Sequence, residues 1–312
     1  MIDWRLLERK LGGQLQLQLQ LQLQLQLQLQ LQLQLQLPLA GARSTPLAGG
    51  DINLAFRLDC GSQRFFVKLN RADRESMFAA EHAGLEAIRN SHAVRVPEVY
   101  MTGNDGKYAY LVMEYIDLGG LLDHDRLAQA LAAMHGCVQP SFGFHCDNYI
   151  GSTAQVNRLT TDWVKFWRQQ RLEFQLELAR RNGIAARLID RGFRLAGSLT
   201  QFFTTYQPRA SLLHGDLWSG NWGFDHVGNP VVYDPACYYG DHEADLAMME
   251  LFGSPGAQFF ARYRECFPID AGYAERRDLY NLYHLLNHAN LFGGSYAGQA
   301  QQVTDRLLAH IN

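Results

Sequence analysis

Hydrophobic and polar residues alternate along this chain in two rhythms, which divide it into a strand-rich part and a helix-rich part. Apolar residues recur at about every second position in two segments, INLAFRL and RFFVKL, which are separated by the turn sequence CGSQ. This pattern predicts a hairpin. Two further strands are predicted on either side of NDGK, in VRVPEVYMTG and YAYLVMEYI. One amphipathic helix, ESMFAAEHAGLEAIRN, lies between the two pairs, so residues 47–117 predict a small antiparallel sheet with an inserted helix.

After residues 117–120, DLGG, the apolar spacing becomes that of helices. Helices are predicted in RLAQALAAMHG, in TDWVKFWRQQRLEFQLELARRNG with Thr161 or Asp162 as its N-cap, and in ARLIDRGFRLAGSLTQFFTTYQ. Two short strands, ASLLHG and PVVYDP, interrupt the helices, which then resume to the C-terminus. The expected fold is α+β and bilobal, with a β-rich N-terminal lobe at residues 38–117 and a mainly helical lobe at residues 118–312.

The N-terminal residues differ from both lobes. Residues 1–13 predict a short amphipathic helix, and residues 14–37 are twelve consecutive Gln-Leu pairs. Strict alternation is a strand period, but 24 residues far exceed the usual ~3–10 of a strand. We interpret the tract as an inserted or expanded repeat without a chemical role, and the alternative is a segment for self-association.

Composition narrows the function without identifying it. The formal net charge is -3 and hydrophobic residues make up 47%, which fits a globular protein and gives no sign of a nucleic-acid or membrane partner. Five cysteines are scattered without a C-x-x-C pair, and no apolar leader or membrane span is present in the sequence. These features predict a cytoplasmic protein. Cys60, at a predicted turn, is a candidate redox residue, although a structural role is favoured.

The octet HGDLWSGN at residues 214–221 carries the first chemical signal. Asp216 and Asn221 have the D-x-x-x-x-N spacing of a kinase catalytic loop, in which the aspartate orients the acceptor hydroxyl and the asparagine binds Mg²⁺. Thirteen residues later, Asp234 follows a short strand and offers a second hard oxygen ligand for Mg²⁺. Together these residues predict ATP-dependent phosphoryl transfer.

The N-terminal lobe holds the matching nucleotide-binding signals. Lys68 lies late in the strand RFFVKL, like the kinase lysine that binds the α- and β-phosphates, and Glu81 on the following helix is its candidate partner. The strand LVMEYI resembles the one that leads into a kinase hinge, so the backbone of Glu114, Tyr115 and Ile116 is expected to meet adenine.

These motifs, together with GGDINLAFRL, DPACYYGDHEADLAM and LLNHANLFGG, resemble the fructosamine kinase family, which shares the fold of aminoglycoside phosphotransferases and protein kinases. The resemblance runs from about Leu47 to the C-terminus. It implies a ketosamine-3-kinase that uses ATP and Mg²⁺ on the C3 hydroxyl of glycated amines or proteins, and thereby a deglycation role. It also implies that GGDIN, with Gly49, Gly50 and Asp51, covers the phosphates. The Gln-Leu tract departs from the family pattern.

Other residues near the octet have structural as well as functional interpretations. His214 and Asp245 are expected to hold the loop, and Trp218 is a candidate contact for the apolar face of a sugar. Asp241 and Glu243 are weaker candidates for binding the substrate. His284 and His288 are spaced like a metal pair but lack a third ligand.

Three alternatives remain open at this point. A related phosphotransferase would act on an aminoglycoside, choline or a sugar, and the tryptophan in the octet argues against it. A non-catalytic pseudokinase scaffold is disfavoured because Lys68, Glu81, Asp216, Asn221 and Asp234 are all present. The third is an assembly-forming protein that uses residues 14–37.

Overall fold

The computed structural model describes residues 42–47 and 52–311, which form two compact units. The first unit comprises the described residues up to Phe78 together with Glu98–Ile116, and the second comprises Ala79–Pro97 and the chain from Asp117 onward. The predicted N-terminal helix, the Gln-Leu tract and Gly49–Asp51 of the predicted phosphate turn lie outside the described residues.

The first unit is built on a five-stranded antiparallel sheet in the order β1-β2-β3-β5-β4. Its strands are β1 (Arg43–Leu47), β2 (Leu54–Cys60), β3 (Gln63–Arg71), β4 (Val99–Asn104) and β5 (Tyr108–Glu114). The four predicted strands are confirmed. β1 was not predicted because RSTPL does not alternate and contains Pro46, which the edge of a sheet tolerates.

Alternation in β2 and β3 produces the core of this unit. Phe56 and Leu58 of β2 and Phe65, Val67 and Leu69 of β3 are buried in one cluster. Lys68 is only 5% exposed, and in the central strand it pairs with Ala55 on one side and Leu111 on the other. The sheet therefore holds the lysine backbone on two sides.

A 3₁₀ turn, η1 (Ala72–Arg74), leads from the sheet into helix α2 (Glu75–Ser91). The observed helix agrees with the predicted segment ESMFAAEHAGLEAIRN within one residue. Its first residues belong to the first unit and the remainder to the second.

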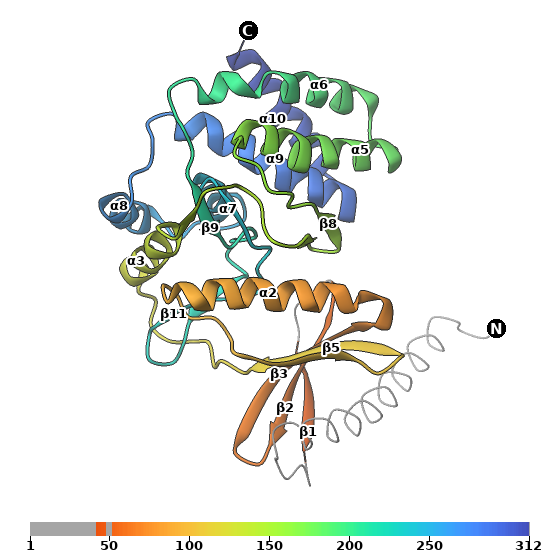
Figure 1. Cartoon of the computed structure of the whole chain (residues 1–312), viewed down its shortest axis with the longest axis vertical. Helices are drawn as coiled ribbons and strands as arrows, with labels where there is room; N and C mark the ends of the chain where they lie inside the picture. The colour runs from red at the N-terminus through yellow and green to blue at the C-terminus, as the bar shows by residue number, and fades with distance from the viewer. Residues whose placement is uncertain (1–41, 48–51, 312) are drawn as a thin grey trace, which may run out of the picture. The chain divides into compact units, whose positions relative to one another are not determined.

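The second unit is mainly helical (Figure 1). Helices α5, α6, α9 and α10 pack beside one another, α7 packs on α9, and α3 packs on α8. The helical bounds are α3 (His124–His135), α4 (Trp163–Trp167), α5 (Glu173–Arg181), α6 (Ala186–Gly197), η3 (Leu199–Phe203), α7 (Glu243–Leu251), α8 (Ala257–Cys266), α9 (Tyr273–Phe292) and α10 (Tyr296–His310).

The long helix predicted after Thr161 is present over residues 163–181, with a π-helical turn in its middle. Asp162 caps it by accepting a 2.9 Å hydrogen bond from the Lys165 backbone N–H, which settles the choice of N-cap. Between α4 and α5 the backbone forms a π-helical turn, η2 (Arg168–Leu172). Residue periodicity did not reveal this turn, because one wider turn barely changes the pattern of apolar positions.

Short strands connect the helices of the second unit. A three-stranded sheet has the order β12-β9-β6, and two hairpins pair β10 with β11 and β7 with β8. The strands are β6 (Val138–Gln139), β7 (Asn148–Ile150), β8 (Thr153–Gln155), β9 (Ala210–Leu213), β10 (Trp222–Phe224), β11 (Pro230–Val232) and β12 (Tyr238–Gly240). The predicted strands β9 and β11 and the α+β class are thus confirmed, whereas the other strands, each of two or three residues, were not predicted.

The described residues contain neither a disulfide nor a helix that could span a membrane. Their cysteines, which are all five of the chain, are free of disulfides, and Cys60 is buried at the end of β2. No helix in the described part of the chain is both long and apolar enough to span a membrane.

Candidate active site

The backbone of the predicted catalytic loop is held by one buried carboxylate. The loop leaves β9 at His214, and Asp245 on α7 accepts hydrogen bonds from the backbone N–H of His214 at 2.7 Å and of Gly215 at 2.8 Å. His135 of α3 contacts the same carboxylate at 3.2 Å. Burial alone would raise the pKa of Asp245, but these hydrogen bonds keep the pKa below its ordinary value. The carboxylate therefore stays charged and fixes the start of the loop.

Gly215 permits a close approach that no other residue allows. Its φ is +83°, and a Cβ at this position would lie 2.1 Å from the carbonyl oxygen of Ala236. The Ala236 N–H in turn donates to the His214 carbonyl oxygen at 2.8 Å. The catalytic loop and the segment after Asp234 are consequently packed directly against each other.

The His214 ring links the same two segments. Its Nε2 donates to the Tyr233 carbonyl oxygen at 2.9 Å, and its Nδ1 accepts from the Asp216 backbone N–H at 3.2 Å. Burial lowers the pKa of His214, which keeps the ring neutral and allows one nitrogen to donate while the other accepts. This geometry makes His214 a support of the loop.

Asp216 and Asn221 form the centre of the candidate site. The Asn221 side-chain nitrogen donates to the Asp216 carbonyl oxygen at 2.8 Å and to its carboxylate at 3.2 Å. Both bonds use the amide nitrogen. The amide oxygen, which is the atom that a magnesium ion would bind, is not engaged in them. The Asn221 backbone N–H donates to the Trp218 carbonyl oxygen at 2.9 Å and closes the loop.

The Asp216 carboxylate is electrostatically unusual. Its burial and, after that, the negative charge of Asp234 raise its pKa to about 7, although the hydrogen bond from Asn221 acts in the opposite direction. Perturbation of this kind is typical of groups that exchange protons in a reaction. A cation bound by Asp234 would oppose the effect of that negative charge on the pKa of Asp216.

Asp234 has a left-handed backbone, with φ of 59°, two residues after the end of β11. The Tyr233 N–H donates to the Asn221 carbonyl oxygen at 3.0 Å, so the chain entering Asp234 is tied to the catalytic loop. A non-glycine residue in this region of φ is uncommon, and such strain concentrates at functional sites. Asp234 is exposed to solvent and accessible to a ligand.

The available oxygen atoms suit magnesium rather than a softer metal. Asn221 supplies an amide oxygen and Asp234 a carboxylate, while Mg²⁺ usually completes its shell with phosphate and water. Within the described residues, no cluster of three or more His, Cys, Asp or Glu side chains forms a metal site. His284 and His288 do not make such a site: the His288 Nδ1 is engaged with the His284 carbonyl oxygen at 2.8 Å.

Trp218 lies on the solvent side of the loop and is 39% exposed. Its indole ring covers Gly220, where a Cβ would come within 2.3 Å of the ring. The neighbouring Ser219 hydroxyl donates to the Phe252 carbonyl oxygen at 2.7 Å, and the Phe252 ring packs on His288. An aromatic face is therefore available two residues from Asp216.

Asp241 and Glu243 have no exposed surface and are bound within the protein. Asp241 accepts hydrogen bonds from the hydroxyls of Tyr206 and Tyr280, and Glu243 pairs with Arg276 through both oxygens, at 2.6 and 3.1 Å. This arrangement favours an internal structural role, so we leave substrate contact by these two residues out of the proposed site.

The predicted nucleotide-binding residues are divided between the two units. Lys68 lies in β3, and Glu114 ends β5, with Tyr115 and Ile116 following it. The Glu114 backbone N–H donates to the Glu98 carbonyl oxygen at 2.7 Å. The Tyr115 ring lies beneath the guanidinium groups of Arg57 and Arg64. Glu81 lies in the part of α2 that belongs to the second unit.

Sequence reasoning missed several buried groups that support the loop. His135 was not singled out because a histidine near the end of an amphipathic helix is unremarkable, yet its Nδ1 contacts the Tyr263 hydroxyl at 2.6 Å. Arg171 and a set of buried amides were also missed, because the π-helical turn around Arg171 is visible only in the structure.

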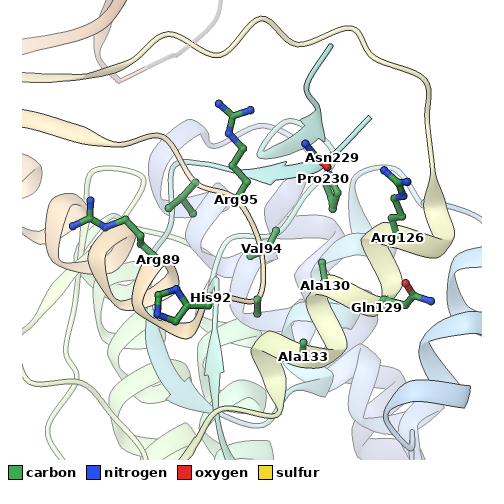
Figure 2. Close-up of a pocket in the computed structure, with 12 residues that line it drawn as sticks. Arg89, His92, Val94, Arg95, Arg126, Gln129, Ala130, Ala133, Asn229 and Pro230 are labelled. Atoms are coloured by element: carbon green, nitrogen blue, oxygen red, sulfur yellow. The ribbon is translucent and has the colours of Figure 1, made fainter. Parts of the chain in front are cut away.

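A separate groove of about 860 Å³ lies in the second unit and includes none of the predicted site residues. Three arginines line it, Arg89, Arg95 and Arg126; in Figure 2 the last two extend in a similar direction and Arg89 points away from them. They form ion pairs with Glu86, Asp225 and Asp123, respectively. These pairings favour a structural role for the arginines.

Comparisons with known proteins agree with the geometry. The profile of the fructosamine kinase family matches residues 24–310. A Synechocystis protein named "Probable ketoamine kinase" is 45% identical over 268 residues, which cover 84% of this chain and 89% of the relative. The chloroplastic protein-ribulosamine 3-kinase of Arabidopsis thaliana is 42% identical over 268 residues, covering 84% of this chain and 81% of that protein.

Solved structures extend the comparison to the fold. A candidate fructosamine-3-kinase from Haemophilus somnus superposes with a TM-score of 0.79 at 29% identity, covering 85% of this chain and 91% of that one. An ADP-bound aminoglycoside phosphotransferase has a TM-score of 0.59 at 14% identity, covering 88% of this chain and 96% of that one. At that identity the second likeness shows the shared fold alone.

Proposed function

The chain belongs to the fructosamine kinase family, and we propose from this premise that it transfers the γ-phosphoryl group of ATP to the C3 hydroxyl of a ketosamine. The observation that supports the proposal best is the hydrogen-bonded pair of Asp216 and Asn221, to which the chain entering Asp234 is tied through Tyr233. The names of the relatives, ketoamine kinase and ribulosamine 3-kinase, support the acceptor class.

In this mechanism Asp216 accepts the proton of the C3 hydroxyl as the oxygen attacks the γ-phosphorus. The new O–P bond forms, the bond to the leaving oxygen of ADP breaks, and the proton passes to the Asp216 carboxylate. A pKa raised to about 7 suits this transfer near neutral pH, because the base is then neither too weak nor permanently protonated.

The remaining residues bind and orient. The Asn221 amide oxygen and the Asp234 carboxylate would hold Mg²⁺, which when bound neutralises charge on the phosphates. Lys68, with Glu81 as its proposed partner, would bind the α- and β-phosphates. Gly49, Gly50 and Asp51 would cover the phosphates, and the backbone of Glu114 to Ile116 would meet adenine.

Trp218 is the proposed contact for the sugar. An exposed indole two residues from the base suits the apolar C–H face of a sugar ring. Phosphorylation at C3 makes a ketosamine prone to eliminate phosphate and release its amine, so the proposed role is deglycation of small amines or proteins.

A kinase assay on ribuloselysine and fructoselysine, run side by side with Mg-ATP, tests the proposal. We expect ADP formation that depends on the acceptor and falls by about 10³-fold or more in Asp216→Asn, since the base is lost but the shape is kept. Activity on aminoglycosides, choline or free sugars alone would favour a related phosphotransferase. No turnover, with Asp216→Ala indistinguishable from the wild type, would favour a pseudokinase scaffold.

The Gln-Leu tract is tested separately. The proposed catalytic residues lie outside it, so deletion of residues 14–37 should leave kcat unchanged. Size-exclusion chromatography before and after the deletion measures self-association. A shift to smaller species would assign that role to the tract, and an unchanged profile would leave it as a repeat without one.

A further inference from the structure

Arg171 is buried in the second unit without an acidic partner. Its side chain has no exposed surface, and no carboxylate of the described residues forms an ion pair with it. It lies in the π-helical turn η2, and its Nε finds no hydrogen-bond partner. Burying a charge without a counter-ion costs folding free energy, so other groups must stabilise this guanidinium.

Carbonyl groups and aromatic rings replace the missing counter-ion. Nη1 donates to the carbonyl oxygens of Val156 at 2.6 Å and Gln170 at 3.0 Å. The guanidinium lies 4.2 Å from the Tyr238 ring centre and 5.8 Å from that of Tyr283. Both contacts are cation–π interactions, and they are strongest where water is excluded.

From Arg171 a chain of buried amides runs toward the candidate active site. Nη2 donates to Asn157 Oδ1 at 2.7 Å, and Asn157 donates to Asn148 Oδ1 at 2.9 Å. Asn148 donates to the Cys237 carbonyl oxygen at 2.7 Å, and Gln155 to that of Ala236 at 3.1 Å. All three amide side chains are at most 3% exposed, so water cannot easily replace these bonds.

Ala236 is the point at which this network meets the catalytic loop. Its carbonyl oxygen accepts from Gln155 and lies where a Cβ on Gly215 would come within 2.1 Å of it, while its N–H donates to the His214 carbonyl oxygen. The Tyr238 ring, which stacks on Arg171, lies 3.3 Å from the Cβ position of Gly215. Amides and ring therefore converge on the residue before Asp216, and Asp234 is two residues from Ala236.

We propose that Arg171 is a positioning residue for phosphoryl transfer. Through the buried amides and the Tyr238 ring it fixes the backbone that carries Asp216 and Asp234. A planar fork is required because one end of the guanidinium serves the Val156 carbonyl while the other serves Asn157. The inference rests on the proposed kinase function, but it concerns contacts that exist in the protein alone.

Two substitutions test the network at different strengths. Arg171→Lys keeps the charge and loses the fork, and we expect kcat to fall about 10- to 100-fold, with KM for ATP changed less than about three-fold. Tyr283→Phe keeps the ring over Arg171 and removes the hydroxyl, which donates to Gln155 Oε1 at 2.7 Å and accepts a hydrogen bond from Gln175. We expect it to lower kcat about two- to ten-fold. Arg168→Lys is the matched control, because Arg168 lies in the same turn but is half-exposed and pairs with Glu173.

Hydrogen exchange on the protein without ligands supplies a readout that is independent of activity. We expect amides in residues 234–238 and 214–216 to exchange faster in Arg171→Lys, with exchange in α10 unchanged. We also expect the effects of Arg171→Lys and Tyr283→Phe on kcat to be non-multiplicative in the double variant. Their partners, Asn157 and Gln155, both donate to Asn148 Oδ1 and so belong to one network.

Each outcome decides the proposal. Wild-type kcat in folded Arg171→Lys would overturn it, as would a loss of kcat accompanied by faster exchange throughout the second unit, which would mean general destabilisation. If Arg171→Lys does not fold, Tyr283→Phe decides by the same two measurements. If the wild-type protein phosphorylates no ketosamine, the proposed function fails, while the exchange pattern still tests whether Arg171 positions the loop.

Discussion

Three buried carboxylates lie within five consecutive residues, 241–245, and belong to two networks whose hydrogen-bond donors differ. Asp245 faces the catalytic loop and accepts from two of its backbone N–H groups. Asp241 and Glu243 instead bind mainly side chains, among them Tyr280 and Arg276 of α9. We call the first set the loop brace (Asp245, His135, His214, Gly215) and the second the helix anchor (Asp241, Glu243, Tyr206, Arg276, Tyr280).

The comparison shows that burial and charge alone do not identify a functional carboxylate. All three acids are at most 1% exposed, so exposure cannot separate them. What separates them is the identity of the donors. Asp245 holds backbone donors of the loop that carries Asp216. Glu243 is held by the Arg276 side chain of α9, which also binds Asp270 and the Phe202 carbonyl oxygen.

Removing the loop brace should have the largest effect. Asp245→Ala leaves two buried backbone N–H groups without an acceptor, and we expect unfolding free energy to fall by about 4 kcal/mol. We also expect kcat to fall about 100-fold, because the loop carrying Asp216 loses its position. Urea unfolding and steady-state kinetics measure the two. Asp245→Asn keeps the size and one oxygen of the side chain, so its stability and kcat should lie between those of the wild type and Asp245→Ala. An unchanged kcat in folded Asp245→Ala would contradict the distinction between the two networks.

Cutting the helix anchor should affect stability without comparable loss of catalysis. Arg276→Met leaves the buried Glu243 carboxylate unpaired, and we expect a loss of about 3 kcal/mol in unfolding free energy. Below the unfolding temperature, kcat should stay within about three-fold of the wild type. Arg306→Met, which removes an exposed pair with Asp278, is the control and should cost at most about 1 kcal/mol. A 100-fold fall in kcat in Arg276→Met would erase the contrast.

The difference between the networks was only partly visible in the sequence. The spacing of Asp216, Asn221 and Asp234 predicted a catalytic loop because phosphoryl transfer requires few residue types at fixed separations. The periodicity also predicted four strands of the first sheet and the main helices. Each of these features is local, so neighbouring residues in the chain suffice to reveal it.

Features that depend on distant partners were not predictable in this way. Nothing near Glu243 indicates that Arg276, 33 residues later, is its partner. Arg171, in the π-helical turn, binds Asn157, and Gln155 of the same network binds the carbonyl oxygen of Ala236, about 80 residues away. The identities of such partners are fixed by tertiary packing, which a single sequence does not display.

Acid should distinguish the Asp245 carboxylate from a buried histidine on α9. Burial, and then the nearby His288, lower the pKa of His284 to about 3, so the folded protein keeps this ring neutral. Because the unfolded chain binds the proton more readily, stability is lost as pH falls from about 6.5 toward 3, by up to about 1.4 kcal/mol per pH unit. The pKa of Asp245 is lowered as well, but its contribution is lost only below its ordinary value of 3.8.

Urea unfolding of the wild type and His284→Asn at pH 8, 6, 5 and 4 measures this window. We expect the slope of unfolding free energy against pH to be shallower in the variant between pH 6 and 4. The difference at pH 8, where the ring is neutral in both states, isolates the packing cost of the substitution. Equal slopes would mean that His284 is not held neutral by the fold.

The smallest expected effect concerns a single hydroxyl at the edge of the helix anchor. Tyr206→Phe removes the 2.9 Å bond to Asp241 but leaves the hydroxyl of Tyr280 and the backbone N–H of Glu243 as donors to the same carboxylate. Because the carboxylate stays solvated by these groups, we expect a loss of about 1 kcal/mol in unfolding free energy and no change in kcat. A fall in kcat without loss of stability would instead show that the helix anchor communicates with the catalytic loop.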